Sequence, residues 1–200
     1  MPLRLLVTDD IPATTQRGLI DAWQDFGALE PAGVISLRSA DPPSFIQIMG
    51  EAVQWLSPLK VAATVFLSQL AKDAASDVYK NKAKIAQALA QIGAAPLRLV
   101  AESLKRVRDE SPRQPRIVLG LSIPDDYFGT ALSITDHSEE EVAYLIAGFV
   151  MRAEVIQQLV QAEVDAGRPP LGRVQVMCSD GGFKLVWMDQ QSVEHQRGIP

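Results

Sequence analysis

Residue types that usually carry catalytic chemistry are scarce in this chain. Among its 200 residues are one cysteine, Cys178, and two histidines, His137 and His195. One cysteine excludes an internal disulfide, and this small set provides no zinc ligand group with the usual spacing. The sequence also contains neither GxGxxG nor GxxxxGKS/T, which excludes the two nucleotide-binding loops that are easiest to recognise.

The few reactive side chains stand where ordinary structural roles explain them. Ser138 follows His137 at the expected start of a helix, where its hydroxyl caps the backbone rather than acting as a nucleophile. Cys178 precedes the turn SDGG without a neighbouring cation to lower the pKa of its thiol, so we expect a buried strand thiol. His195 falls in a C-terminal segment that we expect to be loosely ordered. We therefore predict no catalytic residue and no cofactor.

Charge is distributed unevenly along the chain. The net charge is −5, and residues 1–50, 51–116 and 117–200 carry −3, +5 and −7. The basic middle is densest at residues 97–116, but no aromatic side chain is interleaved there to stack on bases. We expect no specific nucleic-acid binding. An apolar fraction of 47% with 22% charged residues is typical of a globular protein.

The N-terminal sequence predicts no secretion signal. MPLRLLVTDD has a short apolar run that ends in aspartates, instead of the longer apolar core and small-residue cleavage site of a signal peptide. A single cysteine also fits a reducing compartment. We therefore expect a cytoplasmic protein.

The longest helical pattern covers residues 57–93. Ser57 and Pro58 suit the first turn of a helix, and Gly93 suits its end. A continuous helix over these residues would be roughly 50 Å long, whereas a globular chain of this size is only about 40 Å across. We therefore expect this helix to bend, to break within residues 73–84, or to project and cover its apolar face with a partner.

Three environments are compatible with the apolar part of this helix, residues 52–71. Lys60 argues against a membrane span. The lysines that follow suit a helix that lies on an anionic membrane surface. Small residues allow close contact with another helix, which favours a core helix or one packed on a partner protein.

Strand and helix patterns alternate around this helical middle. The predicted strands are residues 3–10, 33–39, 116–123, 128–134, 173–178 and 183–189. The other predicted helices are residues 13–27, 43–53, 96–111 and 138–166. The last of these is the most sharply bounded, because Ser138 and Glu141 match a capping box and Gly167 follows its end.

Strands near both chain ends predict an α+β fold. We expect one mainly antiparallel sheet of about 4–6 strands, covered by helices on at least one face. Residues 43–111 would form a long helical excursion from this sheet, within a single domain of residues 1–190. Residues 191–200 would form a flexible tail. A division into two domains near Pro112 is the alternative.

Asp9 and Asp10 are weak candidates for a metal site. Adjacent carboxylates at the carboxyl end of a strand can hold Mg²⁺, and Asp125 and Asp126 could join them if the strands are neighbours. The chain start resembles the first strand and helix of a response-regulator receiver domain, over about the first 27 residues. That family also has a phosphorylatable aspartate after a third parallel strand and a lysine after a fifth, which have no counterpart here. Turn and cap roles are therefore our preferred interpretation, and we predict no metal.

These observations favour a protein that works by contact rather than by catalysis. We hypothesise a non-enzymatic interaction or accessory module that binds a protein partner, or a second copy of itself, through its basic, alanine-rich helical region. Two alternatives stay open: a divalent-metal-dependent enzyme that acts on a phosphorylated small molecule through acidic residues, and a peripheral membrane-surface protein. The candidate binding residues are Lys72, Lys80, Lys82, Lys84, Arg98, Lys105, Arg106 and Arg108.

Overall fold

The computed structural model describes residues 3–23, 29–35, 44–72, 81–111, 113–122, 129–179 and 182–200. The strands are β1 (Leu3–Thr8), β2 (Leu29–Ile35), β3 (Phe45–Gly50), β4 (Arg116–Leu121), β5 (Thr130–Ile134), β6 (Val174–Ser179), β7 (Gly182–Met188) and β8 (Glu194–Ile199). The helices are α1 (Ala13–Trp23), α2 (Ala52–Lys72), α3 (Lys82–Leu89), α4 (Ala95–Glu110) and α5 (Glu139–Asp165), with a short 3-10 helix, η3 (Ile92–Ala94).

The strands of these described ranges form one sheet of eight, in the order β2-β1-β3-β4-β5-β6-β7-β8. Pairing is antiparallel between β1 and β3, β4 and β5, β6 and β7, and β7 and β8. It is parallel between β1 and β2, β3 and β4, and β5 and β6. Strands from both chain ends meet in this sheet, so the predicted α+β fold is confirmed, with more strands than we expected.

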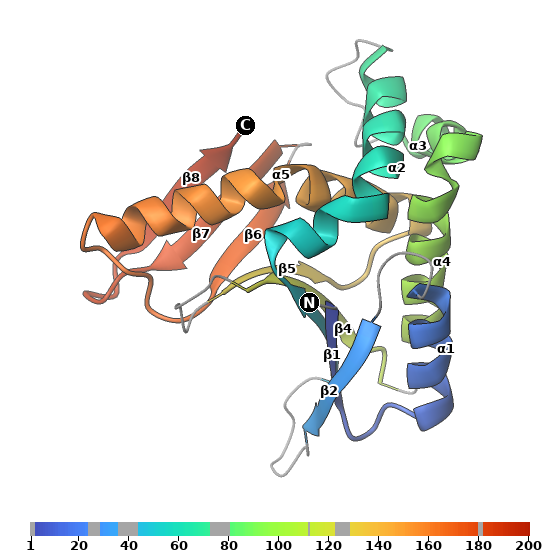
Figure 1. Cartoon of the computed structure of the whole chain (residues 1–200), viewed down its shortest axis with the longest axis horizontal. Coiled ribbons are helices and arrows are strands. Elements are labelled where there is room, and N and C mark those ends of the chain that lie inside the picture. The colour runs from blue at the N-terminus through green and yellow to red at the C-terminus, as the bar shows by residue number, and fades with distance from the viewer. Residues whose placement is uncertain are drawn as a thin grey trace.

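One face of the sheet is apolar and is covered by helices. The strand register places Leu5 opposite Ile48, Ile48 opposite Leu119, Leu119 opposite Leu132, and Leu132 opposite Val176. All five side chains are buried in one continuous core that also includes residues from α1, α2, α4 and α5. Figure 1 shows α5 lying across β7 and β8, and α1 beside α4 at the other end of the molecule. Removing this apolar surface from water is the main stabilising contribution.

α5 is the central helix of the fold. Its predicted capping box is confirmed: the Ser138 N–H donates to Glu141 Oε2 at 2.7 Å, and the Glu141 N–H donates to Ser138 Oγ at 3.4 Å. Gly148 lies directly over the Phe183 ring of β7, where a Cβ atom would collide with the ring. The glycine therefore lets α5 approach the sheet closely.

The helical middle agrees with the prediction in part. Residues 57–93 do not form one continuous helix: α2 ends at Lys72 and α3 begins at Lys82, so the expected break within residues 73–84 is confirmed. The Asn81 side chain caps α3 by accepting from the Lys84 N–H at 3.2 Å. The segment joining α2 and α3, residues 73–80, lies outside the described residues. α2 also begins earlier than Ser57 and Pro58 suggest, because Ala52 is already buried beside β3 and packing outweighs the local signal.

The inner stripe of α2 is covered by the protein itself. Among the described side chains of α2, the buried ones are Ala52, Leu59, Ala62, Ala63, Phe66 and Leu70. α2 packs mainly on α5, and also contacts η3, α3 and α4 (Figure 1). The expectation that the apolar stripe needs a partner to cover it is therefore wrong.

Residues 45–50 are a strand rather than part of a helical excursion over 43–111. Their sequence, FIQIMG, is apolar without clear alternation, and such a short run does not distinguish a strand from a helix. β3 lies between β1 and β4, where Ile46 and Ile48 are fully buried. Pairing on both sides therefore decides the structure of this segment.

The expected flexible tail over 191–200 is also wrong, because residues 194–199 form β8 at one edge of the sheet. β8 is mostly polar, so it lacks the alternation that identifies a strand in sequence. It is held by pairing with β7, with the buried Ile199 opposite Phe183.

Candidate functional site

Several of the predicted cationic binding residues pair with carboxylates of the protein itself, although Lys105 and Arg106 line one pocket on the outer side of α4. Lys82 pairs with Glu141 at 3.5 Å, and Arg98 pairs with Glu102 at 3.5 Å. Lys105 pairs with Asp109 one helical turn away. The Arg98 and Lys105 pairs each lie within α4, and such exposed pairs along a helix contribute only a few tenths of a kcal/mol, roughly, to stability.

The other predicted cations have different environments. Arg108 is buried and lies 3.6 Å from Asp136, so it is not part of an exposed binding surface. Arg106 is exposed on α4, and Lys72 is the last residue of α2. Lys80 lies outside the described residues.

The outer side of α2 combines apolar exposure with positive charge. Val61 is 66% exposed, Ile92 is 94% exposed, and Val65 between them is also exposed. The Gly93 backbone packs on Val65, since a Cβ at Gly93 would lie 3.1 Å from Val65 Cγ1. We call Val61, Val65 and Ile92, with the adjacent Lys60, the α2–η3 surface.

Asp10 has a structural explanation. Its Oδ1 accepts from the Ser44 hydroxyl at 3.0 Å, and its Oδ2 lies 4.0 Å from Arg113 Nε. Burial by itself would raise the pKa of Asp10, but hydrogen bonding with Thr8 and Ser44, together with the charge of Arg113, outweighs burial and lowers it. These contacts tie the end of β1 to the segment that enters β3.

The carboxylates predicted as metal ligands do not form a described cluster. Asp9 is exposed beside Asp10. Asp125 and Asp126 lie outside the described residues. Within the described ranges, no group of three or more histidine, cysteine or acidic residues is placed to hold a metal ion.

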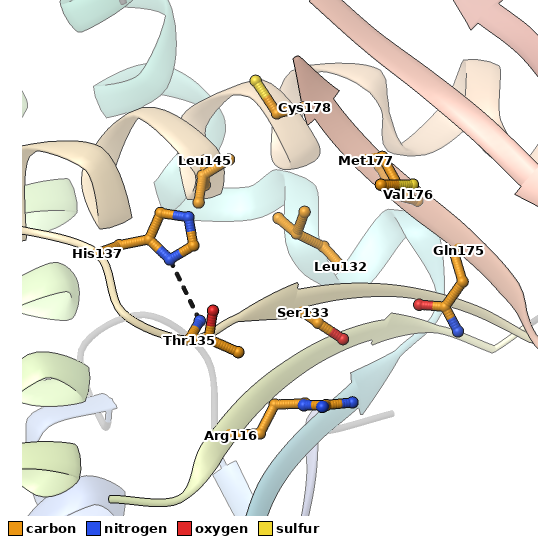
Figure 2. A pocket seen from close by; sticks show the side chains of 10 residues that line it. All are labelled: Arg116, Leu132, Ser133, Thr135, His137, Leu145, Gln175, Val176, Met177 and Cys178. Carbon is orange, nitrogen blue, oxygen red and sulfur yellow. Dashed lines mark hydrogen bonds between the residues drawn. The ribbon is translucent and has the colours of Figure 1, made fainter.

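A cleft opens where the parallel strands β5 and β6 separate. The two strands pair only from Thr130 opposite Val174 to Leu132 opposite Val176. Beyond these pairs lies a cleft of about 400 Å³ at their carboxyl ends, beside the beginning of α5 (Figure 2). Its lining residues are Arg116, Leu132, Ser133, Thr135, His137, Leu145, Gln175, Val176, Met177 and Cys178. The carboxyl ends of neighbouring parallel strands are a common place for ligands in α/β sheets.

His137 is fixed at the edge of this cleft. Its Nδ1 accepts from the Thr135 N–H at 3.2 Å, so in the neutral ring the proton is on Nε2 (Figure 2). Burial lowers the pKa of His137, and Arg108 lowers it further, while Glu141 and Asp136 act in the opposite direction. The net shift is downward, which favours the neutral ring, whose proton is then on Nε2.

Arg116 supplies positive charge on another wall. It is the first residue of β4, and its backbone N–H donates to the Ser44 carbonyl at 2.8 Å. The register of β4 with β5 places the Arg116 side chain on the same face as Ser133, as Figure 2 shows. Among the described residues, Arg116 forms no ion pair and no carboxylate lines the cleft.

Sequence reasoning considered His137 and Cys178 separately, noted Arg116 only as part of the basic stretch 97–116, and missed Gln175. Cys178 is only partly buried, so the expected buried thiol is partly wrong. No local pattern could have found this cleft, because its walls come from β4, β5, β6 and α5. The available signal was the pair of predicted strands flanking a long helix, which is the arrangement of a parallel crossover.

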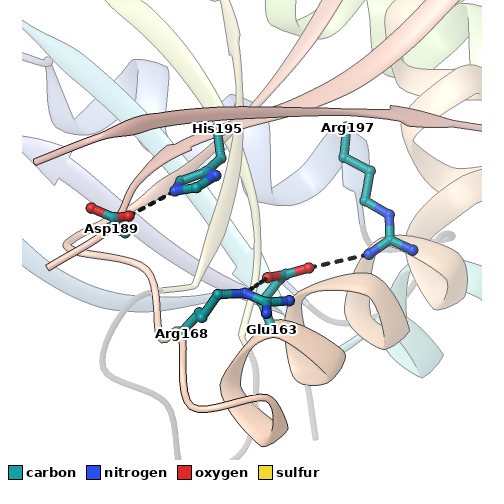
Figure 3. Close-up of polar contacts among 5 residues, drawn as sticks. All are labelled: Glu163, Arg168, Asp189, His195 and Arg197. Atoms are coloured by element: carbon teal, nitrogen blue, oxygen red, sulfur yellow. Dashed lines mark hydrogen bonds and ion pairs between the residues drawn. The ribbon is translucent and has the colours of Figure 1, made fainter. Parts of the chain in front are cut away.

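A second polar group lies at the other end of α5. Glu163 accepts from Arg168 at 3.0 Å and from Arg197 of β8 at 3.2 Å (Figure 3). His195 Nε2 lies 2.7 Å from Asp189 Oδ2, and the ring stacks on Trp187 with centroids 5.4 Å apart.

Asp189 is further bound by backbone N–H groups. Its Oδ1 accepts from the N–H groups of Gln191 and Val193, each at 2.9 Å. The hydrogen bond with His195 and those from the backbone lower the pKa of Asp189. Because these groups are satisfied by one another, we assign this end of the molecule the role of anchoring β8.

No family model matches this sequence, and neither a curated protein nor a solved structure shows significant similarity to it. We therefore infer function from the geometry and charge of the described residues.

Proposed function

We propose that this protein is a non-enzymatic interaction module that binds an acidic protein partner through the α2–η3 surface. The observation that supports this most directly is the exposure of Val61, Val65 and Ile92 on neighbouring elements. Isolated exposed apolar side chains are normal, but adjacent ones surrounded by polar residues are typical of protein contact surfaces.

Charge favours an acidic partner. Within the described part of residues 52–101, every charged residue is a lysine or an arginine. These residues are Lys60, Lys72, Lys82, Lys84 and Arg98, of which Lys82 and Arg98 pair with Glu141 and Glu102, and Lys60 belongs to the α2–η3 surface. A positive charge beside exposed apolar side chains attracts a partner of the opposite sign and speeds its association.

The proposal differs from the sequence-based hypothesis in which side of the helix is used. The buried stripe that includes Leu59, Phe66 and Leu70 packs on the protein's own helices, so it is not free for a partner. The opposite side, with Val61 and Val65, is the part of α2 that solvent reaches. The proposed contact is therefore smaller than the whole apolar helix.

The test is an affinity pulldown from extracts of the native host, comparing three forms of the full chain. The first is wild type, and the second carries Val61→Ser, Val65→Ser and Ile92→Ser. The third is a matched control that removes two exposed apolar side chains elsewhere, Leu171→Ser and Val193→Ser. We expect an acidic protein that wild type and control retain and the α2–η3 variant loses.

Two further measurements distinguish the other hypotheses. Cosedimentation with vesicles containing phosphatidylserine would favour membrane-surface binding if it is strong, salt-sensitive and lost in the α2–η3 variant. Light scattering after size exclusion would favour self-association if wild type is a dimer and the variant a monomer. Retention of the same proteins by all three forms would contradict the proposal.

A further inference from the structure

The cleft between β5 and β6 shares no residue with the α2–η3 surface, so an inference about it stands apart from the proposed function. Its volume of about 400 Å³ lies within the range of small-molecule sites, which is roughly 300–1,000 Å³. Its walls carry charged, neutral polar and apolar side chains (Figure 2).

The charge of the cleft selects for an anion. Arg116 is the charged side chain among its described lining residues, and no aspartate or glutamate faces it there. Asp136 precedes His137 in the chain, but it lies 3.6 Å from Arg108 and does not line the cleft. A guanidinium presents a fork of N–H donors that matches a carboxylate or a phosphate oxygen pair.

Neutral donors stand on the neighbouring walls. His137 has its Nδ1 occupied by the Thr135 N–H, so Nε2 is the nitrogen left for a ligand, and Figure 2 shows it turned toward the side of Leu145 and Cys178. Ser133 and Gln175 add a hydroxyl and an amide. These groups can donate to the ligand without adding a second charge.

The remaining walls are apolar. Leu132 and Leu145 come from β5 and α5, and Val176 and Met177 come from β6. Met177 is exposed, and methionine adapts its shape to irregular apolar ligands. A ligand that fills this cleft therefore needs a compact apolar body as well as an acidic group.

We propose that the cleft binds a small organic anion, a carboxylate or phosphate monoester with a compact apolar body, whose anionic group pairs with Arg116. Ser133 and Gln175, on the same face of the sheet as Arg116, can donate to the same ligand. The apolar body lies against the exposed Met177. The separation of β5 from β6 creates the space, because the two strands diverge after Leu132 and Val176.

The only cysteine in the chain provides the measurement, because Cys178 lines this cleft. The rate of its alkylation by N-ethylmaleimide is followed by mass spectrometry on the full chain, at fixed pH because the thiolate is the reactive form. The probes are 3-phenylpropionate, phenyl phosphate and the uncharged 3-phenylpropanol, each up to about 10 mM, which detects even millimolar affinity. Saturation-transfer NMR of the same probes gives a second measurement that does not depend on thiol reactivity.

We expect at least one anion to slow alkylation at least about threefold and the alcohol to have little effect, since a bound anion engages Arg116. Comparing 3-phenylpropionate with phenyl phosphate shows whether the site prefers a carboxylate or a phosphate. Arg116→Gln should weaken the protecting anion about tenfold, the loss of one charge-assisted contact. Arg17→Gln, an exposed change on α1, is the matched control and should leave protection unchanged.

Met177→Glu places a negative charge in the cleft at an exposed position, so it tests the proposal even if Arg116→Gln fails to fold. It should abolish binding of the anion in the NMR experiment. The proposal is overturned if neither anion binds by either method, if the alcohol protects equally, or if protection survives both cleft variants. None of these results bears on the α2–η3 surface, whose partner is measured separately.

Discussion

α5 and α2 are both apolar and pack on each other, yet the protein covers them to different extents. α5 lies between the sheet and the other helices: Gly148 rests on Phe183, and α2, α3 and α4 pack on its other sides. α2 buries only its inner stripe and exposes Val61 and Val65 on the outside. The position of a helix in the layers, rather than its hydrophobicity, therefore decides which helix can offer an apolar contact surface.

The same comparison bears on membrane binding. Among the described helices, α5 alone is long and apolar enough to cross a membrane, but 56% of the relevant window is buried inside the protein. Such burial is what a core helix shows. The cytoplasmic location that we expect from the sequence stays a prediction.

The largest expected effect contrasts the two sides of α2. Phe66→Ala should lower the free energy of unfolding by about 3–5 kcal/mol, because it empties a fully buried site between helices. Val61→Ala, on the exposed side, should change it by less than about 0.5 kcal/mol. Urea unfolding of both variants measures the difference, and similar values for the two would contradict the layer assignment.

The next largest effect on stability comes from comparing the same substitution, glycine to alanine, in α5 and in α1. Gly148→Ala should destabilise the protein by about 1–3 kcal/mol, because the added Cβ collides with Phe183. Gly18→Ala on α1 meets nothing within 4 Å and should stabilise by up to about 1 kcal/mol through helix propensity. Thermal and urea unfolding report both signs. A stabilised Gly148→Ala variant would show that α5 lies farther from β7.

A smaller effect distinguishes the caps of α5 and α3. Ser138→Ala should cost about 1 kcal/mol of unfolding free energy, because it removes one of the two reciprocal hydrogen bonds of the capping box and leaves Glu141 without its counterpart. Asn81→Ala removes a single hydrogen bond from a short outer helix and should cost less. Urea unfolding of the two variants provides the comparison, and an equal or larger loss for Asn81→Ala would contradict it.

The smallest effect is the dependence of folding stability on pH that the titration of His137 causes. Its pKa in the folded protein is lower than in the unfolded chain, so protonation favours unfolding. Stability is therefore complete above the unfolded pKa of about 6.5, falls as the pH drops below it, and reaches its full loss below the folded pKa. Asp10 and Asp189 also have lowered pKa values, but their stability is lost only at the more acidic pH where carboxylates titrate.

NMR titration of the ring protons measures this shift, with His137→Gln to assign the signal. Arg108→Gln removes a cation that lowers the pKa of His137, so the signal should then titrate at higher pH. Arg106→Gln, on the exposed side of α4, is the control. A His137 signal that titrates above the ordinary histidine range would contradict the burial described for this ring.

The elements that the sequence predicted well are those with signals inside themselves. The capping box at Ser138 and the turn after Cys178 place α5, β6 and β7 close to their predicted positions. The sequence identified the candidate cations one by one, but it did not show that Arg108 is buried, because helix periodicity does not state which face a neighbouring element covers. The cleft was missed because Arg116, His137 and Cys178 come from separate elements.

The amino-acid sequence by itself determined an α+β chain with a capped α5, two antiparallel hairpins and a cationic middle, because caps, turns and charge are properties of residues near one another. The tertiary structure alone decided that residues 45–50 form a central strand and that a polar C-terminal segment forms an edge strand. It also decided that α2 buries Phe66 and exposes Val61 to solvent. These outcomes depend on partners far along the chain, and the free energy of burying them together outweighs the weak local preferences of each segment.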